Sequence, residues 1–197
     1  MVYARTLGGN TYTFQVSGKL WRNSLIMQDR ETGSSWSHVT GRAIDGKAKG
    51  AQLEKLEAIE TTWGLWYEAH PDTKVLEKSE EVKASYYQDY FDDPERMGLF
   101  RAQWLNEKMP GKTLVYGVVV GAHAVAVTDA ALAGDEPVQI DLGATPVVVF
   151  RAADGGVRAF IPKAGAQGAG SEMEGLAVTP VYWFAWSNFY PNTKVID

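Results

Sequence analysis

The chain contains no cysteine and only three histidines among its 197 residues. The lack of cysteine excludes disulfide bonds, thiol nucleophiles and zinc sites with cysteine ligands. The histidines, His38, His70 and His123, do not show the H-x-H or H-x-x-x-H spacing of a local multi-histidine metal site. We therefore expect no metal and no cofactor, and cysteine usage gives no information on the cellular compartment.

Basic residues are not in excess, because 19 Lys and Arg stand against 24 Asp and Glu, for a net charge of −5. A protein that binds nucleic acid through the phosphate backbone carries a basic excess, so we expect no nucleic-acid partner. Long apolar runs are also lacking. The longest uncharged one, Leu114 to Val127, is too short to span a bilayer, and residues 1–25 show no apolar run of the signal-peptide type. The partner we expect is an unknown small molecule or protein.

What is present is the composition of an ordinary folded domain, with 45% hydrophobic and 22% charged residues. Alternating apolar residues and glycine-containing turns predict a mainly β fold with short helices, α+β by count. Three hairpins are predicted, pairing 25–27 with 34–39, 113–120 with 124–127, and 146–150 with 157–161. A further strand is predicted over 11–16. Helices are predicted over 61–70, 80–90 and 94–106. The first helix has the clearest limits, since Thr61 or Thr62 can cap it and Pro71 ends it.

An internal repeat is the most informative feature. Residues 61–77, TTWGLWYEAHPDTKVLE, align without a gap with residues 181–197, VYWFAWSNFYPNTKVID, and are identical at six of 17 positions. Two of the chain's seven tryptophans align with two others in this comparison. The repeat predicts two related β-rich units, the second abbreviated, packed as one pseudo-symmetric domain over 1–197. Their approximate ranges are 3–77 and 146–197, joined by 78–145.

The repeated tryptophans predict repeated packing. We expect Trp63 and Trp66 to share one face of a short helix, and Trp183 and Trp186 to do the same. A strand should follow each helix, at 74–77 and 194–197, and all four indoles should be buried. The alternative is a tryptophan platform on which a sugar ring stacks. The residues to which we assign a structural role are Trp36, Trp63, Trp66, Pro71, Trp183, Trp186 and Pro191.

Four segments form a recognisable set: Val16-Ser17-Gly18, the D-R-x-T-G-S-x-W-S pattern of Asp29–Ser37, the G-x-A-x-x-G turn of Gly41–Gly46, and T-W-x-x-W-x-x-x-H-P-x-T over Thr62–Thr73. Together they resemble the bacterial and archaeal family called domain of unknown function 3179. The resemblance covers roughly residues 3–77 and 176–197, is weaker over 110–160 and is poor over 78–109. His38 stands where the family commonly has Gln.

The resemblance implies a fold grouping and no mechanism, because the family has no settled activity. Family members usually continue upstream into a segment that often carries cysteine. Many members look exported or membrane-anchored, which slightly favours an extracytoplasmic setting. The class that we expect is a non-catalytic β-rich binding or scaffold domain.

Candidate ligand-binding residues gather around one hairpin: Asp29, Arg30, Ser35, His38 and Arg42. An arginine there can clamp a carboxylate or phosphate, and a histidine can change charge near neutral pH. The alternative function is an enzyme of unknown reaction. Its polar site would lie between the repeats and consist of Asp29, His38 and either Arg30 or Arg42. The structural interpretation is that Asp29 caps the turn and Arg30 pairs with an acid.

Other motifs are incomplete. The acidic residues between Asp89 and Glu95 suit calcium by ligand type but lack the order of an EF-hand loop. Gly111-Lys112-Thr113 has the end of a P-loop, but position 106 is Asn and not Gly. No serine lies in a G-x-S-x-G turn. A complete catalytic constellation is therefore not visible in the sequence.

Overall fold

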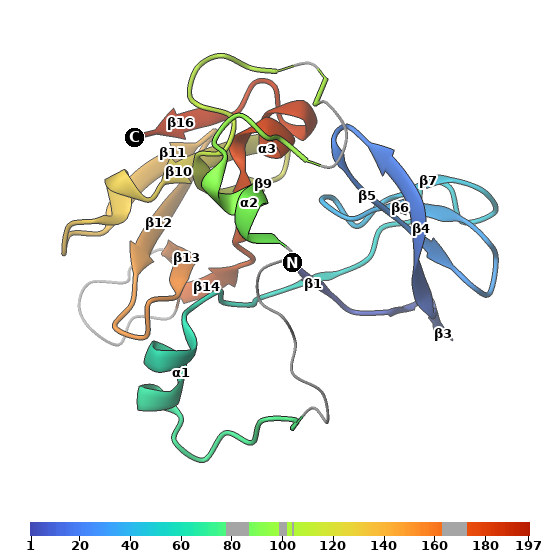
Figure 1. Ribbon diagram of the computed structural model, residues 1–197, viewed down its shortest axis with the longest axis horizontal. Coiled ribbons are helices and arrows are strands. Elements are labelled where there is room, and N and C mark those ends of the chain that lie inside the picture. The colour runs from blue at the N-terminus through green and yellow to red at the C-terminus, as the bar shows by residue number, and fades with distance from the viewer. Residues whose placement is uncertain (78–86, 99–101, 104, 163–172) are drawn as a thin grey trace.

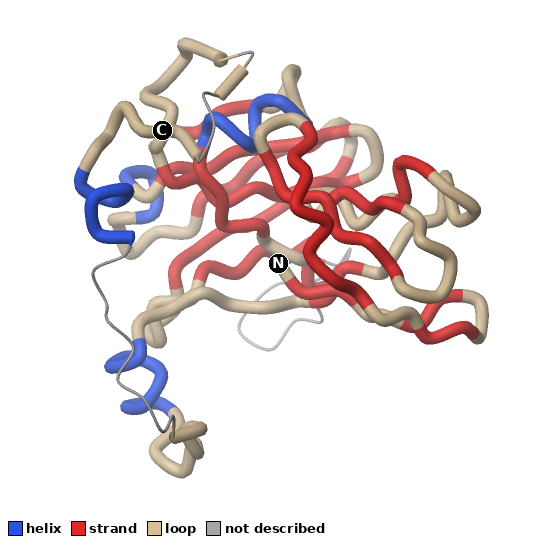
Figure 2. The backbone as a smooth tube through the Cα atoms, turned by 45° about the vertical axis from the view of Figure 1, so that its right-hand side comes forward, coloured by secondary structure: helices blue, strands red, loops and turns tan. Residues whose placement is uncertain are grey.

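The computed structural model describes residues 1–77, 87–98, 102–103, 105–162 and 173–197 (Figure 1). The protein is mainly β, as the sequence predicts. Among the described residues the strands form three four-stranded sheets and two two-stranded pairs. They make up the body of the molecule, and the helices lie at its periphery (Figure 2).

The first four-stranded sheet is antiparallel, in the order β4-β5-β6-β7. Its strands are β4 (Phe14–Trp21), β5 (Ser24–Asp29), β6 (Ser35–Ser37) and β7 (Ala43–Asp45). Arg22 and Asn23 both have positive φ, 51° and 61°, as a type I′ hairpin turn requires. The indole of Trp36 is fully buried and packs edge-on against Tyr12 and Phe14. This packing gives the first sheet a small core of its own.

Two short antiparallel pairs accompany this sheet. They are β1 (Val2–Tyr3) with β8 (Lys55–Leu56), and β2 (Thr6–Leu7) with β3 (Asn10–Thr11). Gly41, with φ of +69°, lies under the Tyr3 ring, and a Cβ at this position would stand 2.9 Å from Cδ1 of that ring. The Tyr3 hydroxyl lies 2.9 and 2.8 Å from the carbonyls of His38 and Val39. Tyr3 thereby joins the β1–β8 pair to the first sheet.

The other two sheets pack face to face. The middle sheet has the order β15-β9-β10-β16, with β16 parallel to β10. Its strands are β9 (Leu114–Val120), β10 (His123–Thr128), β15 (Thr179–Tyr182) and β16 (Lys194–Ile196). The third sheet contains, in order, β11 (Val138–Leu142), β12 (Thr145–Arg151), β13 (Val157–Pro162) and β14 (Met173–Leu176). A 3-10 turn, η2 (Ala130–Leu132), joins the two.

The middle sheet is buried on both faces. Val118 and Val125 face the third sheet, whereas Val115 and Ala126 face the helix α3 (Trp183–Phe189). A strand covered on both sides is apolar at nearly every position, and this explains the LVYGVVV run of β9. The C-terminal part is thus a stack of one helix and two sheets.

The predicted hairpins and the first predicted helix are confirmed. Antiparallel pairing joins β5 to β6, β9 to β10 and β12 to β13. The helix α1 (Trp63–Ala69) begins after Thr62, whose hydroxyl accepts a hydrogen bond from the Leu65 N–H at 3.4 Å. The chain turns at Pro71 directly after the C-cap residue His70.

Two local predictions are wrong. Residues 74–77 are not a strand, because no described strand lies beside them to supply a ladder. The helix predicted over 94–106 is absent from the described residues of that range. The helix that is present, α2 (Gln88–Asp92), ends before this range, with Asp93 as its C-cap. Of the helix predicted over 80–90, residues 80–86 lie outside the described part of the chain.

Candidate functional site

Asp29, the first candidate ligand-binding residue, lies inside the first sheet. Its carboxylate is buried and accepts hydrogen bonds from the Trp36 indole at 2.7 Å, the Thr32 hydroxyl at 2.9 Å and the Thr32 backbone N–H at 2.5 Å. Burial alone would raise the pKa of Asp29, but these hydrogen bonds outweigh it and lower that pKa. The carboxylate holds the turn and the tryptophan of its own hairpin.

The other candidate residues of this hairpin do not converge on Asp29. Arg30 and Arg42 are exposed, and Ser35 is half-buried. His38 is half-buried at the end of the hairpin, and burial is the main cause of its lowered pKa. The charges of the N-terminal amino group and of Lys55 add to this effect. The charge of Lys55, from another element, thus acts on His38. Among the described residues, the partners of the Asp29 carboxylate are Thr32 and Trp36, and the His38 ring is not one of them.

Lys55 of β8 lies where the first half of the chain meets the second. Its ammonium group donates a hydrogen bond to the hydroxyl of Thr179 on β15, 124 residues further along. Burial lowers the pKa of Lys55 to about 8. Burial also raises the pKa of Tyr3 and of Tyr190, and the Tyr190 phenol adds to the shift at Tyr3. Sequence reasoning missed Lys55 and Thr179, because neither belongs to a motif and only the fold brings them together.

The helices α1 and α3 have the same local conformation, as their sequence repeat predicts. The C-cap residues have φ/ψ of −135°/66° at His70 and −129°/68° at Tyr190. Trp66 Nε1 donates to the Thr73 hydroxyl at 2.9 Å, and Trp186 Nε1 donates to Thr193 at 3.1 Å. Each of these indoles also stacks on the C-cap ring, with centroids 4.1 and 4.2 Å apart.

The two helices differ in what covers them. Five residues of α3 are buried, including both tryptophans at 0% exposure. No residue of α1 is buried, and Trp63 is 54% exposed. The prediction that all four indoles are buried is therefore correct for Trp183 and Trp186 and wrong for Trp63, while Trp66 is half-buried. The reason is that α3 lies on the middle sheet, whereas α1 projects from the body of the molecule (Figure 1).

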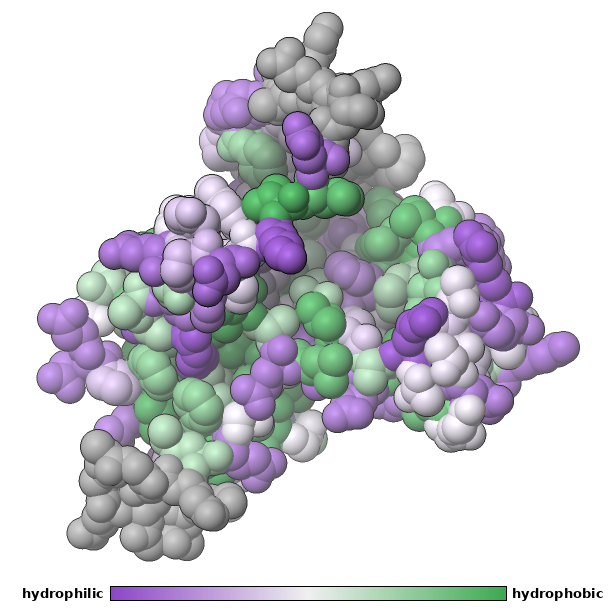
Figure 3. Space-filling view, turned by 90° about the horizontal axis from the view of Figure 1, so that it is seen from below, coloured by the Kyte–Doolittle hydropathy of each residue, from purple (hydrophilic) through white to green (hydrophobic). Residues whose placement is uncertain are grey.

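Five large apolar side chains of the first copy are open to solvent, and we call them the α1 surface. They are Trp63 (54% exposed), Leu65 (38%), Tyr67 (49%), Val75 (68%) and Leu76 (86%). Figure 3 views the molecule from the end at which α1 lies and shows apolar side chains open to solvent among hydrophilic ones. Clusters of exposed apolar groups on a protein mark contact sites.

A cavity of about 500 Å³ lies behind α1, between the helix and strands β13 and β14. Trp66 and His70 line it on the helix side, and the ion pair of Arg158 with Asp154 lines the sheet side. The Asp154 carboxylate accepts hydrogen bonds from Arg158, and these are the main reason why the pKa of Asp154 is lowered to about 2. Burial acts in the opposite direction. The Gly156 N–H and the charges of Arg158 and His70 lower it further.

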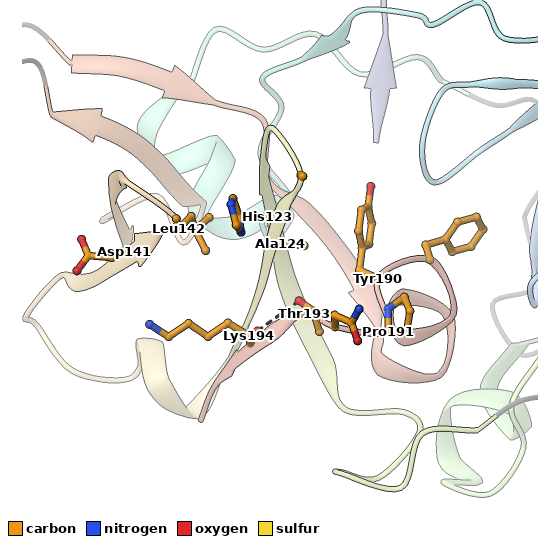
Figure 4. Close-up of a pocket in the computed structure, with 12 residues that line it drawn as sticks. His123, Ala124, Asp141, Leu142, Tyr190, Pro191, Thr193 and Lys194 are labelled. Carbon is orange, nitrogen blue, oxygen red and sulfur yellow. Dashed lines mark hydrogen bonds between the residues drawn. The ribbon is translucent and has the colours of Figure 1, made fainter.

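A second cavity, of about 380 Å³, lies at the end of the other repeat (Figure 4). His123 and Asp141 approach it from β10 and β11, while Tyr190 and Lys194 come from the segment that follows α3. Both cavities thus lie at the C-terminal end of a repeated helix, beside His70 in one copy and Tyr190 in the other.

The described residues show no metal centre and no membrane helix. Within the described ranges, no three His, Asp or Glu side chains are grouped so that they could hold a metal ion. In that same part of the chain, no helix is long and apolar enough to cross a membrane. The chemistry that the structure offers is an apolar surface at α1 and a buried lysine at the junction of the two halves.

The fold is mainly β, and two helices of aligned sequence, α1 and α3, have the same local conformation, the first open to solvent and the second covered. The chain belongs to the family described as protein of unknown function (DUF3179), whose model matches residues 1–193. This membership confirms the resemblance noted in the sequence and adds no activity to it. Neither the curated proteins nor the solved structures contain a match to the chain.

Proposed function

We propose that this chain is a non-catalytic, β-rich binding domain, and that the α1 surface is its contact with another polypeptide. The observation that carries the proposal is the contrast between two copies of one segment. The copy at 181–197 buries its helix on the protein's own sheet, and the copy at 61–77 leaves the same helix exposed. Trp63, Tyr67 and Leu76 expose apolar surface to water. A partner that covers this surface removes it from water, and this stabilises the complex.

A site-specific cross-link tests this proposal. A photoreactive phenylalanine analogue replaces Tyr67 in the full chain, which is expressed and irradiated in the cells of its source. The expected result is one adduct of defined mass that disappears when Leu76→Glu is added. The matched control places the same analogue at Glu68, the adjacent exposed position on α1. An adduct at 67 no stronger than at 68, or one that persists in the Leu76→Glu variant, contradicts the proposal.

A second candidate is the enzyme of unknown reaction, with Asp29, His38 and Arg30 or Arg42 as its site residues. Lys55 is the observation that favours it, because an amine of pKa about 8 is partly neutral near physiological pH and can act as a base or nucleophile. A broad panel of hydrolase substrates tests it. Turnover that is lost in Lys55→Met and retained in Leu76→Glu would favour the enzyme over the binding domain.

A further inference from the structure

The cavity behind α1 has the size of a small-molecule pocket and lies between elements of this chain. The N-terminal end of α1 rests on the β12–β13 turn (Figure 1), where a Cβ at Gly155 would stand 2.6 Å from Leu65 Cδ1. The Thr61 hydroxyl donates to the Asp154 carbonyl of the same turn. The helix is thus held against the third sheet at its first turn. The space of about 500 Å³ behind Trp66 and His70 falls within the range of pockets that take small organic molecules.

The lining of this cavity is mainly apolar. Seven of its eleven described lining residues have apolar side chains. Val157, Ala159 and Val178 are buried and form its floor. The Trp66 ring lines the helix side and stacks on the His70 ring, with the two centroids 4.1 Å apart. The apolar body of a small molecule would therefore leave water on entering this space, and that transfer is favourable.

The charged groups of the cavity do not balance. Arg158 and Asp154 neutralise each other, since Arg158 Nη1 donates to Asp154 Oδ1 at 2.8 Å and Nη2 donates to Oδ2. Glu57 is in no ion pair within the described part of the chain. With His70 counted as neutral, the described lining carries one excess negative charge. A carboxylate without a partner beside an apolar space attracts a cation.

The fold holds Glu57 at the rim of the cavity. Its carboxylate lies over Gly175 of β14, where an added Cβ would overlap the Cδ and Oε1 atoms of Glu57. A side chain at position 175 would therefore displace the carboxylate. Glu57 is also exposed, so a ligand can reach this carboxylate from solvent.

We propose that the cavity behind α1 binds a small organic cation, with its ammonium group at the Glu57 carboxylate and its apolar body between Trp66 and the floor of the cavity. The indole ring supports the same ligand class, because the face of tryptophan attracts a positive charge. This site is separate from the α1 surface, which lies on the solvent side of the same helix, and it does not depend on the polypeptide contact proposed there.

An anion of the same size fits this lining less well. It would meet the carboxylates of Glu57 and Asp154, and the Arg158 guanidinium that could attract it is already paired with Asp154. A neutral compound gains the apolar contacts but not the attraction of Glu57. The structure therefore predicts an order of affinity in which the cation binds most tightly and the anion most weakly.

Three indole compounds of similar size and different charge test this order. Tryptamine carries an ammonium group, tryptophol a hydroxyl and indoleacetate a carboxylate. Each is titrated at pH 7 into the full chain labelled with ¹⁵N, and the indole N–H signal of Trp66 is followed by NMR. Trp66→Phe identifies this signal among those of the seven tryptophans. We expect a saturable shift with tryptamine, about fivefold weaker binding of tryptophol, and no saturable shift with indoleacetate.

Glu57→Gln is the matching variant of the chain. Glutamine keeps the shape of the side chain and removes its charge, and the position is exposed, so the fold is kept. We expect tryptamine to bind this variant about fivefold more weakly, while tryptophol binds it as it binds the wild-type chain. Glu54→Gln is the control. It removes the same charge from an exposed residue that does not line the cavity, and tryptamine binding should stay unchanged.

Three results would overturn the inference. They are no saturable shift of the Trp66 signal with tryptamine, equal affinity for the three probes, and unchanged tryptamine binding by Glu57→Gln. The cross-link from position 67 gives a separate answer on the proposed function. If that adduct forms and tryptamine does not bind, the α1 surface remains a polypeptide contact and the cavity is not a site for organic cations.

Discussion

Asp29 shows how one buried side chain holds several local elements. The same carboxylate ends β5, fixes Thr32 in the following turn and accepts the hydrogen bond of the Trp36 indole in β6. A buried indole N–H without a partner is costly, so the position of Trp36 depends on this acceptor. Three residues of the D-R-x-T-G-S-x-W-S pattern, Asp29, Thr32 and Trp36, are therefore explained by the structure of the hairpin.

Asp29→Asn should lower the free energy of unfolding by about 1–3 kcal/mol at pH 7, because it weakens charge-assisted hydrogen bonds to a buried acceptor. The pKa of Asp29 is lowered in the fold, so its contribution is present above the unfolded pKa and is lost as pH falls through the folded one. Urea unfolding at pH 7 and pH 3 measures both effects. Asp45→Asn, at an exposed position, is the control and should change little.

Trp183→Ala and Trp63→Ala, at aligned positions of the repeat, should differ in cost. Trp183 is fully buried, and its removal should cost about 3–5 kcal/mol. Trp63 is 54% exposed, and its ring packs on that of Tyr67 at the helix surface, so its removal should cost about 1 kcal/mol or less. Urea unfolding of both variants tests the difference. A loss of 3 kcal/mol or more in Trp63→Ala would show that this side chain is packed.

The short elements were predictable where a local signal set them. Gly121 forms the turn of the β9–β10 hairpin with φ of +57°, and Thr62 and Pro71 bound α1. Burial was not predictable in the same way. Two segments with the same spacing of tryptophans fold alike, but only the surface opposite each helix decides whether its indoles are buried, and that surface is not part of the segment.

Gly117→Val should destabilise the protein by about 1–3 kcal/mol, since a side chain at this point of β9 overlaps the Trp186 ring. Gly64→Ala in α1 is the matched control. No atom lies within 4 Å of a Cβ at that position, and alanine is favoured over glycine in a helix by about 0.5–1 kcal/mol. Thermal melts of both variants check the contrast. If Gly117→Val melts like the wild-type chain, the indole is not seated on this glycine.

The two halves of the molecule meet through contacts that no motif indicates. Trp21 packs edge-on against Phe189, Arg22 donates to the Asn188 carbonyl at 2.9 Å, and Lys55 reaches Thr179. The two residues of each pair are far apart in the chain, so the spacing of residues in the sequence does not show that they are in contact. For the same reason the hairpin that contains Asp29 and His38 could be predicted from the sequence, while the position of Lys55 against Thr179 could not.

Lys55 gives the whole molecule a pH dependence that can be measured. An unfolded lysine titrates near 10.4, whereas the folded one titrates near 8. Between these values the unfolded chain binds more protons, so the free energy of unfolding should rise with pH. We expect a gain of about 1–2 kcal/mol from pH 8 to pH 10, after allowance for partial solvent exposure. Above pH 10 the raised pKa values of Tyr3 and Tyr190 act in the opposite direction.

Lys55→Met should remove this rise, because methionine keeps the apolar stem and carries no titrating group. The variant should also be at least as stable as the wild-type chain at pH 7, where the wild-type fold bears the cost of a partly buried charge. Lys47→Met, at an exposed position, should keep the rise. Urea unfolding at pH 7, 8, 9 and 10 compares the three chains. A wild-type free energy of unfolding that is flat or falls from pH 8 to pH 10, or a rise that persists in Lys55→Met, would show that Lys55 is not buried at the junction.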